Sequence, residues 1–204
     1  MRRCFLKKKQ VHASEQKRED VAQARKEWKE KQENHVELPV DKLVFLDESG
    51  VNIDMVRRYG RAKNKNRVND YAPVNTPKKT TLVSSVRLDG TQAYEFFQGS
   101  LNGKNFLSYV KNTLIPTLKK GDIVVMDNLS CHKVKGVKEA IEEAGASVLY
   151  LPPYSPDFNP IEMMWSKIKA LLRNWKTDTP ELLHSVIPDA FSSVSVSDIF
   201  GWFT

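Results

Sequence analysis

Two short apolar runs, each ending in an aspartate, constrain the fold of this chain more than any other feature. Residues 42–47 read KLVFLD and residues 122–127 read DIVVMD. Continuous apolar runs of this length are typical of strands buried on both faces of an α/β sheet. The carboxyl ends of parallel strands meet at one edge of such a sheet, where functional groups gather. The runs therefore predict an α/β fold in which Asp47 and Asp127 end neighbouring strands beside a functional site.

The segments between and after these runs complete the α/β pattern. Residues 80–99 predict a β-hairpin with Asp89-Gly90 as its turn. A third short strand is expected at residues 147–151. Apolar periodicity predicts helices at residues 102–120, 132–145, 160–175 and 179–191, the last of them cut at Pro188.

Residues 1–36 differ in composition from the rest and predict a basic helical arm or linker. They hold eleven Lys/Arg and few large apolar residues. The stretch SEQKREDVAQARKEWKEKQEN reads as a helix capped by Ser14 whose thin apolar stripe is typical of a solvated linker helix. Pro39 breaks this helix, so one globular domain is expected over residues 37–204.

The bulk properties exclude several classes of protein. A net charge of +7 and a pI near 9.3 favour a polyanionic partner such as nucleic acid. No apolar run is long enough for a membrane span, and the basic start lacks the apolar core of a secretory signal. Cys4 and Cys131 form neither a disulfide framework nor a CxxC pair. We therefore expect a cytoplasmic protein associated with the nucleoid.

A third carboxylate, Glu162, lies at the predicted start of the helix at residues 160–175. Asn159 and Pro160 precede it, in the order N-cap, first helical residue, and Glu at the third position. One interpretation is a capping box, in which Glu162 reaches back to the N–H of Asn159. The other is a metal ligand aimed into an active site. This stretch alone is compatible with both, and we expect Glu162 to do both, because a capping position fixes the carboxylate at the helix start.

Three converging carboxylates require a cation to relieve their mutual repulsion. Asp47, Asp127 and Glu162 offer the hard oxygen ligands that Mg²⁺ prefers, and Mn²⁺ is an alternative. Two such ions can activate an attacking oxygen and stabilise a leaving oxygen in phosphodiester chemistry. We therefore predict a site for two ions formed by these three residues.

Basic residues near the predicted site suggest contacts with DNA phosphates. The segment 57–79 holds eight Lys/Arg against one acid, Asp70. Further cations follow Glu162 at helical spacing. A solvated loop and a solvated helix face are the alternatives. The predicted phosphate contacts are Arg57, Arg58, Arg61, Lys63, Lys65, Arg67, Lys169 and Arg173.

Three stretches together resemble a known family. VFLDESG, VVMDNLSCHK and LPPYSPDFNPIEMMWSKIK are similar to the signature blocks of DDE transposases of the mariner superfamily, in its bacterial insertion-sequence branch. Thirty-four residues separate Asp127 from Glu162, which is the spacing of that branch. The resemblance makes Asp47, Asp127 and Glu162 the acidic triad. It assigns supporting roles to Glu48, Asn128, His132, Ser155, Pro156 and Asn159.

The resemblance implies a fold, an activity and partners. The expected fold is a ribonuclease H-like mixed sheet flanked by helices. The expected activity is metal-dependent cleavage at the terminal inverted repeats of a transposon and strand transfer into target DNA, carried out by a homodimer. Family members carry helix-turn-helix modules before the catalytic domain, and here only the linker helix is recognisable. A separate helix-turn-helix protein, or a missing N-terminal module, would supply that function.

Other functional classes remain open at this point. A different ribonuclease H-like nuclease would prefer hybrids or junctions to transposon ends, and a non-catalytic DNA-binding remnant would lack metal-dependent nicking. A haloacid dehalogenase-type phosphotransferase would need a second Asp where Ser49 stands. Cys131-His132 lacks partners at zinc spacing, so a packing Cys and a hydrogen-bonding His are expected.

Overall fold

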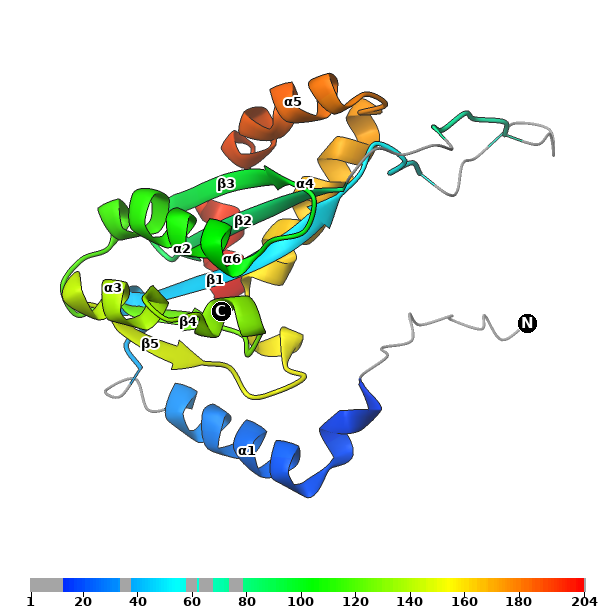
Figure 1. Cartoon of the computed structure of the whole chain (residues 1–204). Helices are drawn as coiled ribbons and strands as arrows, with labels where there is room; N and C mark the ends of the chain where they lie inside the picture. Colours follow the sequence, from blue (N-terminus) through cyan, green and yellow to red (C-terminus); the bar gives the residue numbers. More distant parts are fainter. Residues whose placement is uncertain (1–12, 34–37, 58–61, 63–67, 74–78, 204) are drawn as a thin grey trace, which may run out of the picture.

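A computed structural model describes residues 13–33, 38–57, 62, 68–73 and 79–203 and centres on one five-stranded sheet (Figure 1). The strands lie in the order β3-β2-β1-β4-β5. Their bounds are β1 Leu43–Val51, β2 Thr80–Arg87, β3 Gln92–Gln98, β4 Ile123–Met126 and β5 Ser147–Tyr150. Strands β1, β2 and β3 pair antiparallel, and β4 pairs parallel with both β1 and β5. The predicted mixed sheet is therefore confirmed.

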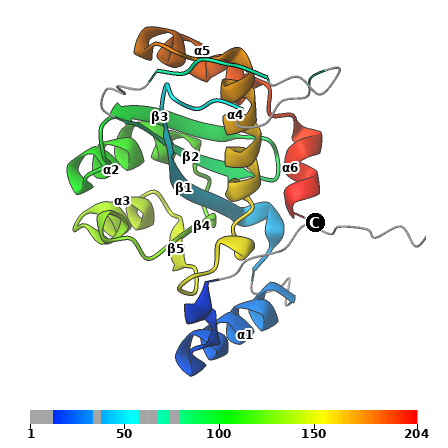
Figure 2. The ribbon, with the colours of Figure 1, turned by 90° about the vertical axis from the view of Figure 1, so that its right-hand side faces the viewer.

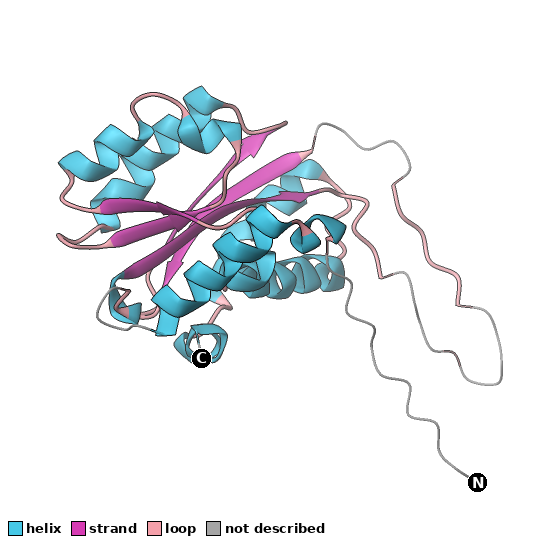
Figure 3. Cartoon of the chain, turned by 90° about the horizontal axis from the view of Figure 1, so that it is seen from below, coloured by secondary structure: helices cyan, strands magenta, loops and turns pink. Residues whose placement is uncertain are grey.

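Helices cover both faces of this sheet (Figure 3). They are α1 Glu19–Glu33, α2 Gly103–Tyr109, α3 Val137–Glu143, α4 Ile161–Trp175, α5 Pro180–Ser192 and α6 Val196–Phe203. Short 3-10 helices span Ser14–Lys17, Val40–Lys42, Ile115–Thr117, Ser130–Lys133 and Pro156–Phe158, and a π-helical turn spans Val110–Leu114. No helix among the described residues has the length and apolar character that crossing a membrane requires.

Alternation along β1 divides the core into two clusters. Successive side chains of a strand point to opposite faces. Val44 and Leu46 pack in the cluster that includes α2 and α3. Leu43 and Phe45 pack in the cluster that includes α4, α5 and α6. The same alternation directs Asp47 toward α4 and Glu48 toward the opposite face.

The N-terminal helix packs more closely than a solvated linker helix would. In α1, Val21 and Trp28 are buried, with exposed fractions of 2% and 4%. Trp28 belongs to the same apolar cluster as Phe45 of β1 and Trp165 of α4. An exposed pair of side chains on a helix stabilises that helix by a few tenths of a kcal/mol, and burying a tryptophan side chain contributes several times as much. Trp28 therefore anchors α1 to the sheet domain.

Among the local predictions that were wrong, three concern where strands and helices of the sheet domain begin, end or break. The strand begun at Leu43 does not end at Asp47 but continues to Val51, because its far half pairs antiparallel with β2. Helix α5 runs through Pro188 because Ala190 and Phe191 beyond it are buried, which offsets one lost backbone hydrogen bond.

The third wrong prediction concerns residues 132–145, where helix α3 starts only at Val137. Gly136 precedes it with φ +95°, a left-handed conformation that interrupts a right-handed helix. Helix α6 was not predicted from the sequence.

Candidate active site

The fold brings the three predicted carboxylates to one cavity. The parallel pairing of β1 with β4 runs from Leu43↔Ile123 to Phe45↔Val125. Continuing that register by two residues sets Asp47 level with Asp127. Glu162, near the start of α4, lines the same cavity of about 480 Å³ as these two aspartates. Asp47, although inside β1, therefore lies just beyond the parallel part of the sheet, where a strand-end aspartate would lie.

Asp47 is nearly buried, with an exposed fraction of 9%, and its nearest described donor is uncharged. The indole Nε1–H of Trp165 donates to its Oδ2 at 3.3 Å. Burial, together with the charges of Glu48, Glu162 and Asp127, raises the pKa of Asp47 to about 8. A carboxylate in this environment loses its proton readily only when a cation balances the added charge.

Asp127 is held in place by two donors. Its Oδ1 accepts from the backbone N–H of Leu129 at 2.9 Å and lies 2.8 Å from Nδ1 of His132. Burial works to raise the pKa of Asp127, but the hydrogen bonds from His132 and Leu129 outweigh it and lower that pKa. Asp127 is therefore ionised and fixed in orientation.

Glu162 does not form the capping box that its spacing suggested. The residue preceding α4 is Pro160, and no side chain caps the helix. The N–H of Asn159 donates to the carbonyl of Pro156 at 3.1 Å, so it is not held by Glu162. Partial burial raises the pKa of Glu162, Lys169 opposes this shift, and Asp127 adds to it. Its carboxylate is thus available to a ligand in the cavity.

The donor set at this cavity fits a divalent cation. Three carboxylates line it, and Asn159 lines it as well. The side-chain oxygen of Asn159 is buried without a hydrogen-bond partner, a costly state that a cation or its bound water would relieve. Hard oxygen donors without sulfur or nitrogen favour Mg²⁺ or Mn²⁺ over softer metals.

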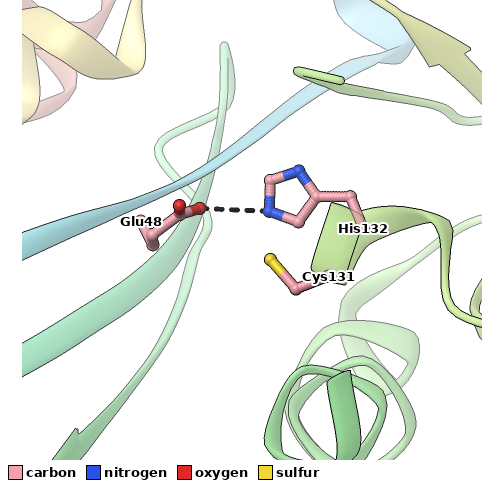
Figure 4. A group of neighbouring side chains, drawn as sticks. All are labelled: Glu48, Cys131 and His132. Atoms are coloured by element: carbon pink, nitrogen blue, oxygen red, sulfur yellow. Dashed lines mark hydrogen bonds and ion pairs between the residues drawn. The ribbon is translucent and has the colours of Figure 1, made fainter. Parts of the chain in front are cut away.

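A second cluster lies on the opposite face of β1 (Figure 4). Nε2 of His132 lies 3.0 Å from Oε2 of Glu48, and its ring packs 4.5 Å from that of Phe106. Burial disfavours the charged imidazole, but the hydrogen bonds and charges of Asp127 and Glu48 raise the pKa of His132 to about 9. His132 is therefore a buried cation that links the two carboxylates.

Cys131 lies beside the Glu48–His132 ion pair. The ligand atoms of Glu48, Cys131 and His132 lie within 4.8 Å of one another. Burial and the charge of Glu48 raise the pKa of the Cys131 thiol. Both ring nitrogens of His132 lie within 3.0 Å of carboxylate oxygens, Nε2 near Glu48 and Nδ1 near Asp127, so an ion-pair bridge describes the contacts of this histidine.

Two other predicted supporting residues brace the loops around the cavity. Asn128 donates its side-chain N–H to the carbonyl of Leu151 at 2.6 Å and accepts from Nζ of Lys133 at 2.7 Å. Ser155 donates its hydroxyl to the carbonyl of Pro153 at 3.0 Å. Asn128 thereby ties the end of β4 to the end of β5.

The predicted DNA contacts are only partly described. Arg57, Arg173 and Lys176 line a hollow of about 310 Å³, although Arg57 is far from the other two in the sequence. Lys169 is half-buried close to the triad, where burial lowers its pKa and Glu162 opposes the shift. Arg58, Arg61, Lys63, Lys65 and Arg67 lie outside the described residues.

Sequence reasoning missed two residues that support the site. The apolar stripe of α4 assigned Trp165 to the core, and it is indeed buried, but its indole N–H also reaches Asp47. Arg25 of α1 contacts the loop before α4 and was counted only as part of a basic arm. No local periodicity distinguishes Arg25 from its neighbouring lysines.

Fold and cavity together define a class: a ribonuclease H-like domain with an acidic site at the edge of its sheet. Residues 42–183 match the family model of the DDE superfamily endonucleases, and the chain belongs to this family. No curated protein matches the chain by sequence.

Solved structures of a mariner transposase share the fold. The Mos1 transposase paired-end complex with left transposon end has a TM-score of 0.76 at 14% identity, covering 98% of this chain and 63% of that one. The mariner Mos1 paired end complex with Mg has a TM-score of 0.79 at 15% identity, and the match covers 99% of this chain and 63% of that one. The catalytic domain of Mos1 mariner transposase has a TM-score of 0.67 at 17% identity, and the match covers 90% of this chain and 86% of that one. This chain thus spans about 63% of the transposase chain in those complexes.

Proposed function

We propose that this chain is the catalytic part of a mariner-type DDE transposase, which cleaves DNA at transposon ends and joins those ends to target DNA. The observation that carries the proposal is the convergence of Asp47, Asp127 and Glu162 on one cavity, in a chain of the DDE endonuclease family. The similar fold of Mos1 transposase, solved with a transposon end, supports the choice of substrate. The spacing from Asp127 to Glu162 supports the insertion-sequence branch.

The three carboxylates would hold one or two Mg²⁺ or Mn²⁺ ions. Mos1 complexes solved with Mg and with Mn support this choice of metals. The ions would activate an attacking oxygen and stabilise the leaving oxygen at the scissile phosphate. The protein's own contribution is orientation: Trp165 fixes Asp47, and His132 fixes Asp127.

The cations of the chain would hold the DNA backbone. Arg57 and Arg173 line one hollow, and Lys169 lies between that hollow and the carboxylates, so a phosphate chain along α4 would meet all three. We propose residues 37–204 as the catalytic domain and residues 1–36 as a basic arm. A homodimer would pair two transposon ends in the nucleoid, and a helix-turn-helix module or protein would select their sequence.

A plasmid-nicking assay with Mn²⁺ tests the proposal. The wild-type chain is expected to nick supercoiled DNA, and Asp127→Ala to lose this activity. Glu143→Ala, which removes an exposed carboxylate at the end of α3, is the matched control and is expected to nick normally. Full activity in Asp127→Ala would overturn the triad. Preference for RNA–DNA hybrids or four-way junctions over transposon ends would instead indicate a different ribonuclease H-like nuclease.

A further inference from the structure

We propose that Arg25 of α1 is a positioning residue for Glu162. It holds the loop at residues 154–158, which leads into α4, in the conformation that aims the Glu162 carboxylate into the cavity. The proposal rests on the function proposed above and extends it to the helix assigned to the arm. Figure 2 shows α1 beside the loop that connects β5 to α4.

The guanidinium of Arg25 makes a dense set of contacts with this loop. Its Nη2 donates to Oδ2 of Asp157 at 2.6 Å, and its Nη1 donates to Oδ1 of the same carboxylate at 3.0 Å. Nη1 also donates to the hydroxyl of Ser155 at 2.7 Å and approaches the carbonyl of Tyr154 at 3.5 Å. The guanidinium carbon lies 4.3 Å from the ring centroid of Phe158. One side chain therefore contacts four of the five loop residues.

This contact differs from an ordinary surface salt bridge. The pair is bidentate, a geometry that gives directional strength. The side chains of Arg25 and Asp157 are 15% and 39% exposed, whereas those of the local pair Arg18–Asp20 are 60% and 66% exposed. Screening by water weakens the exposed pair far more than the shielded one. The helix that carries Arg25 is also held against the sheet domain, because Trp28, about one turn later in α1, is buried in the core.

The loop needs such support. Tyr154 has φ +55°, a left-handed conformation that is costly for an aromatic residue and persists only where surrounding contacts enforce it. Its carbonyl accepts from Nε2 of Gln16 at 2.6 Å, a second contact from the N-terminal segment. The conformation of this loop is thus enforced by residues more than a hundred positions earlier in the chain.

Backbone hydrogen bonds carry this conformation to Glu162. The N–H of Phe158 donates to Ser155, and the N–H of Asn159 donates to Pro156, each at 3.1 Å. The N–H of Glu162 then donates to Asn159, also at 3.1 Å. Because α4 begins without a side-chain cap, its first turn depends on this loop for orientation. Movement of the loop would therefore displace the carboxylate of Glu162.

Two measurements on the full-length chain test the proposal without relying on nicking. The first is Mn²⁺ binding by calorimetry, and the second is hydrogen exchange at residues 158–163. Arg25→Ala is expected to weaken Mn²⁺ binding about tenfold, as loss of a group that orients a metal ligand typically does, and to speed exchange there. Arg25→Lys is expected to fall in between, because an ammonium cannot reproduce the bidentate fork.

Lys26→Ala is the matched control. Lys26 is the next residue of α1, is 70% exposed and pairs with Glu30 on its own helix. Its loss is expected to leave both measurements at wild-type values. Asp157→Asn weakens the same contact from the loop side without removing a side chain. It serves as the second variant if Arg25→Ala fails to fold.

A double variant separates positioning from general destabilisation. With Glu162→Ala already present, adding Arg25→Ala is expected to weaken Mn²⁺ binding no further, because the ligand that Arg25 positions is gone. An additional tenfold loss, or wild-type binding and exchange in Arg25→Ala itself, would overturn the proposal. A wild-type chain that binds Mn²⁺ but never nicks DNA would refute the proposed function, while the binding and exchange data would still decide the role of Arg25.

Discussion

Asp47 and Glu48 are neighbours in β1, yet the two faces of the strand give them opposite electrostatic environments. Asp47 faces α4, and burial together with the charges of Glu48, Glu162 and Asp127 raises its pKa to about 8. Glu48 faces the other side, where the buried imidazole of His132 lies 3.0 Å away and supplies a positive charge. One carboxylate is neutralised within the protein and the other is left for an external cation. The face of the strand, more than the residue type, decides which acid lies beside a cation of the protein.

The substitution expected to have the largest effect on the contrast between Asp47 and Glu48 is Asp47→Asn. The amide keeps the shape and removes the charge, so Mn²⁺ binding and nicking are expected to fall below detection. In differential scanning fluorimetry, Mn²⁺ is expected to raise the melting temperature of the wild type and not that of the variant. Without metal, the variant is expected to melt at a temperature equal to or above wild type, since a buried uncompensated carboxylate costs stability. A large metal-dependent shift in Asp47→Asn would contradict the assignment.

The next effect in size concerns the opposite face. His132→Ala removes the cation that links Glu48 to Asp127, and urea unfolding is expected to register a loss of about 2 kcal/mol. This is below the roughly 3–5 kcal/mol of a fully buried pair, because both carboxylates keep some contact with water. Adding Glu48→Gln to His132→Ala is expected to recover part of the loss, because it removes one of the unpaired charges. A further loss in the double variant would mean that Glu48 serves another partner.

A smaller effect is expected from Trp165→Phe. Phenylalanine retains most of the buried aromatic packing but cannot donate to Asp47, so the expected change is a loss of about 1 kcal/mol or less and Mn²⁺ binding weaker by a few fold. Calorimetry and thermal melting on the same samples measure both quantities. Trp165→Leu, which also removes aromatic packing, is expected to lose more stability without weakening Mn²⁺ binding further. Unchanged Mn²⁺ binding in Trp165→Phe would show that the indole N–H does not position Asp47.

The smallest effect concerns Arg57 and Arg173, on the face where we propose that DNA binds. Neutralising Arg57 and Arg173 together is expected to flatten the dependence of log K on log salt by about two units, roughly 0.9 for each phosphate that is no longer neutralised. Lys138→Ala in α3 is the control, because that helix covers the opposite face of the sheet. The measurement is a salt titration against end-sequence and scrambled duplexes. An equal change in slope for Lys138→Ala would indicate binding spread over both faces.

The sequence by itself determined the approximate positions of the strands and of most helices, and it singled out the three carboxylates that line one cavity. These features are local: apolar runs of strand length in β1 and β4, the Asp89-Gly90 turn, and the periodic apolar stripe of α4. The parallel pairing of strands is a regular consequence of an α/β pattern, so the meeting of Asp47 with Asp127 could be anticipated. The order Asn159, Pro160, Glu162 was misleading, because the loop before α4 uses the Asn159 N–H in a tight turn with Pro156.

Only the tertiary structure decided which charges are compensated and which side chains position the site. Three features depend on elements that come from distant parts of the chain and pack against one another. They are the burial of Asp47, the cation beside Glu48 and the salt bridge between Arg25 and Asp157. Arg25 and Asp157 lie 132 residues apart, and nothing in the pattern of α1 marks Arg25 among the other cations there. Burial and Coulomb interactions depend on distances in space, whereas hydrophobic periodicity reports only which face of a single element turns inward.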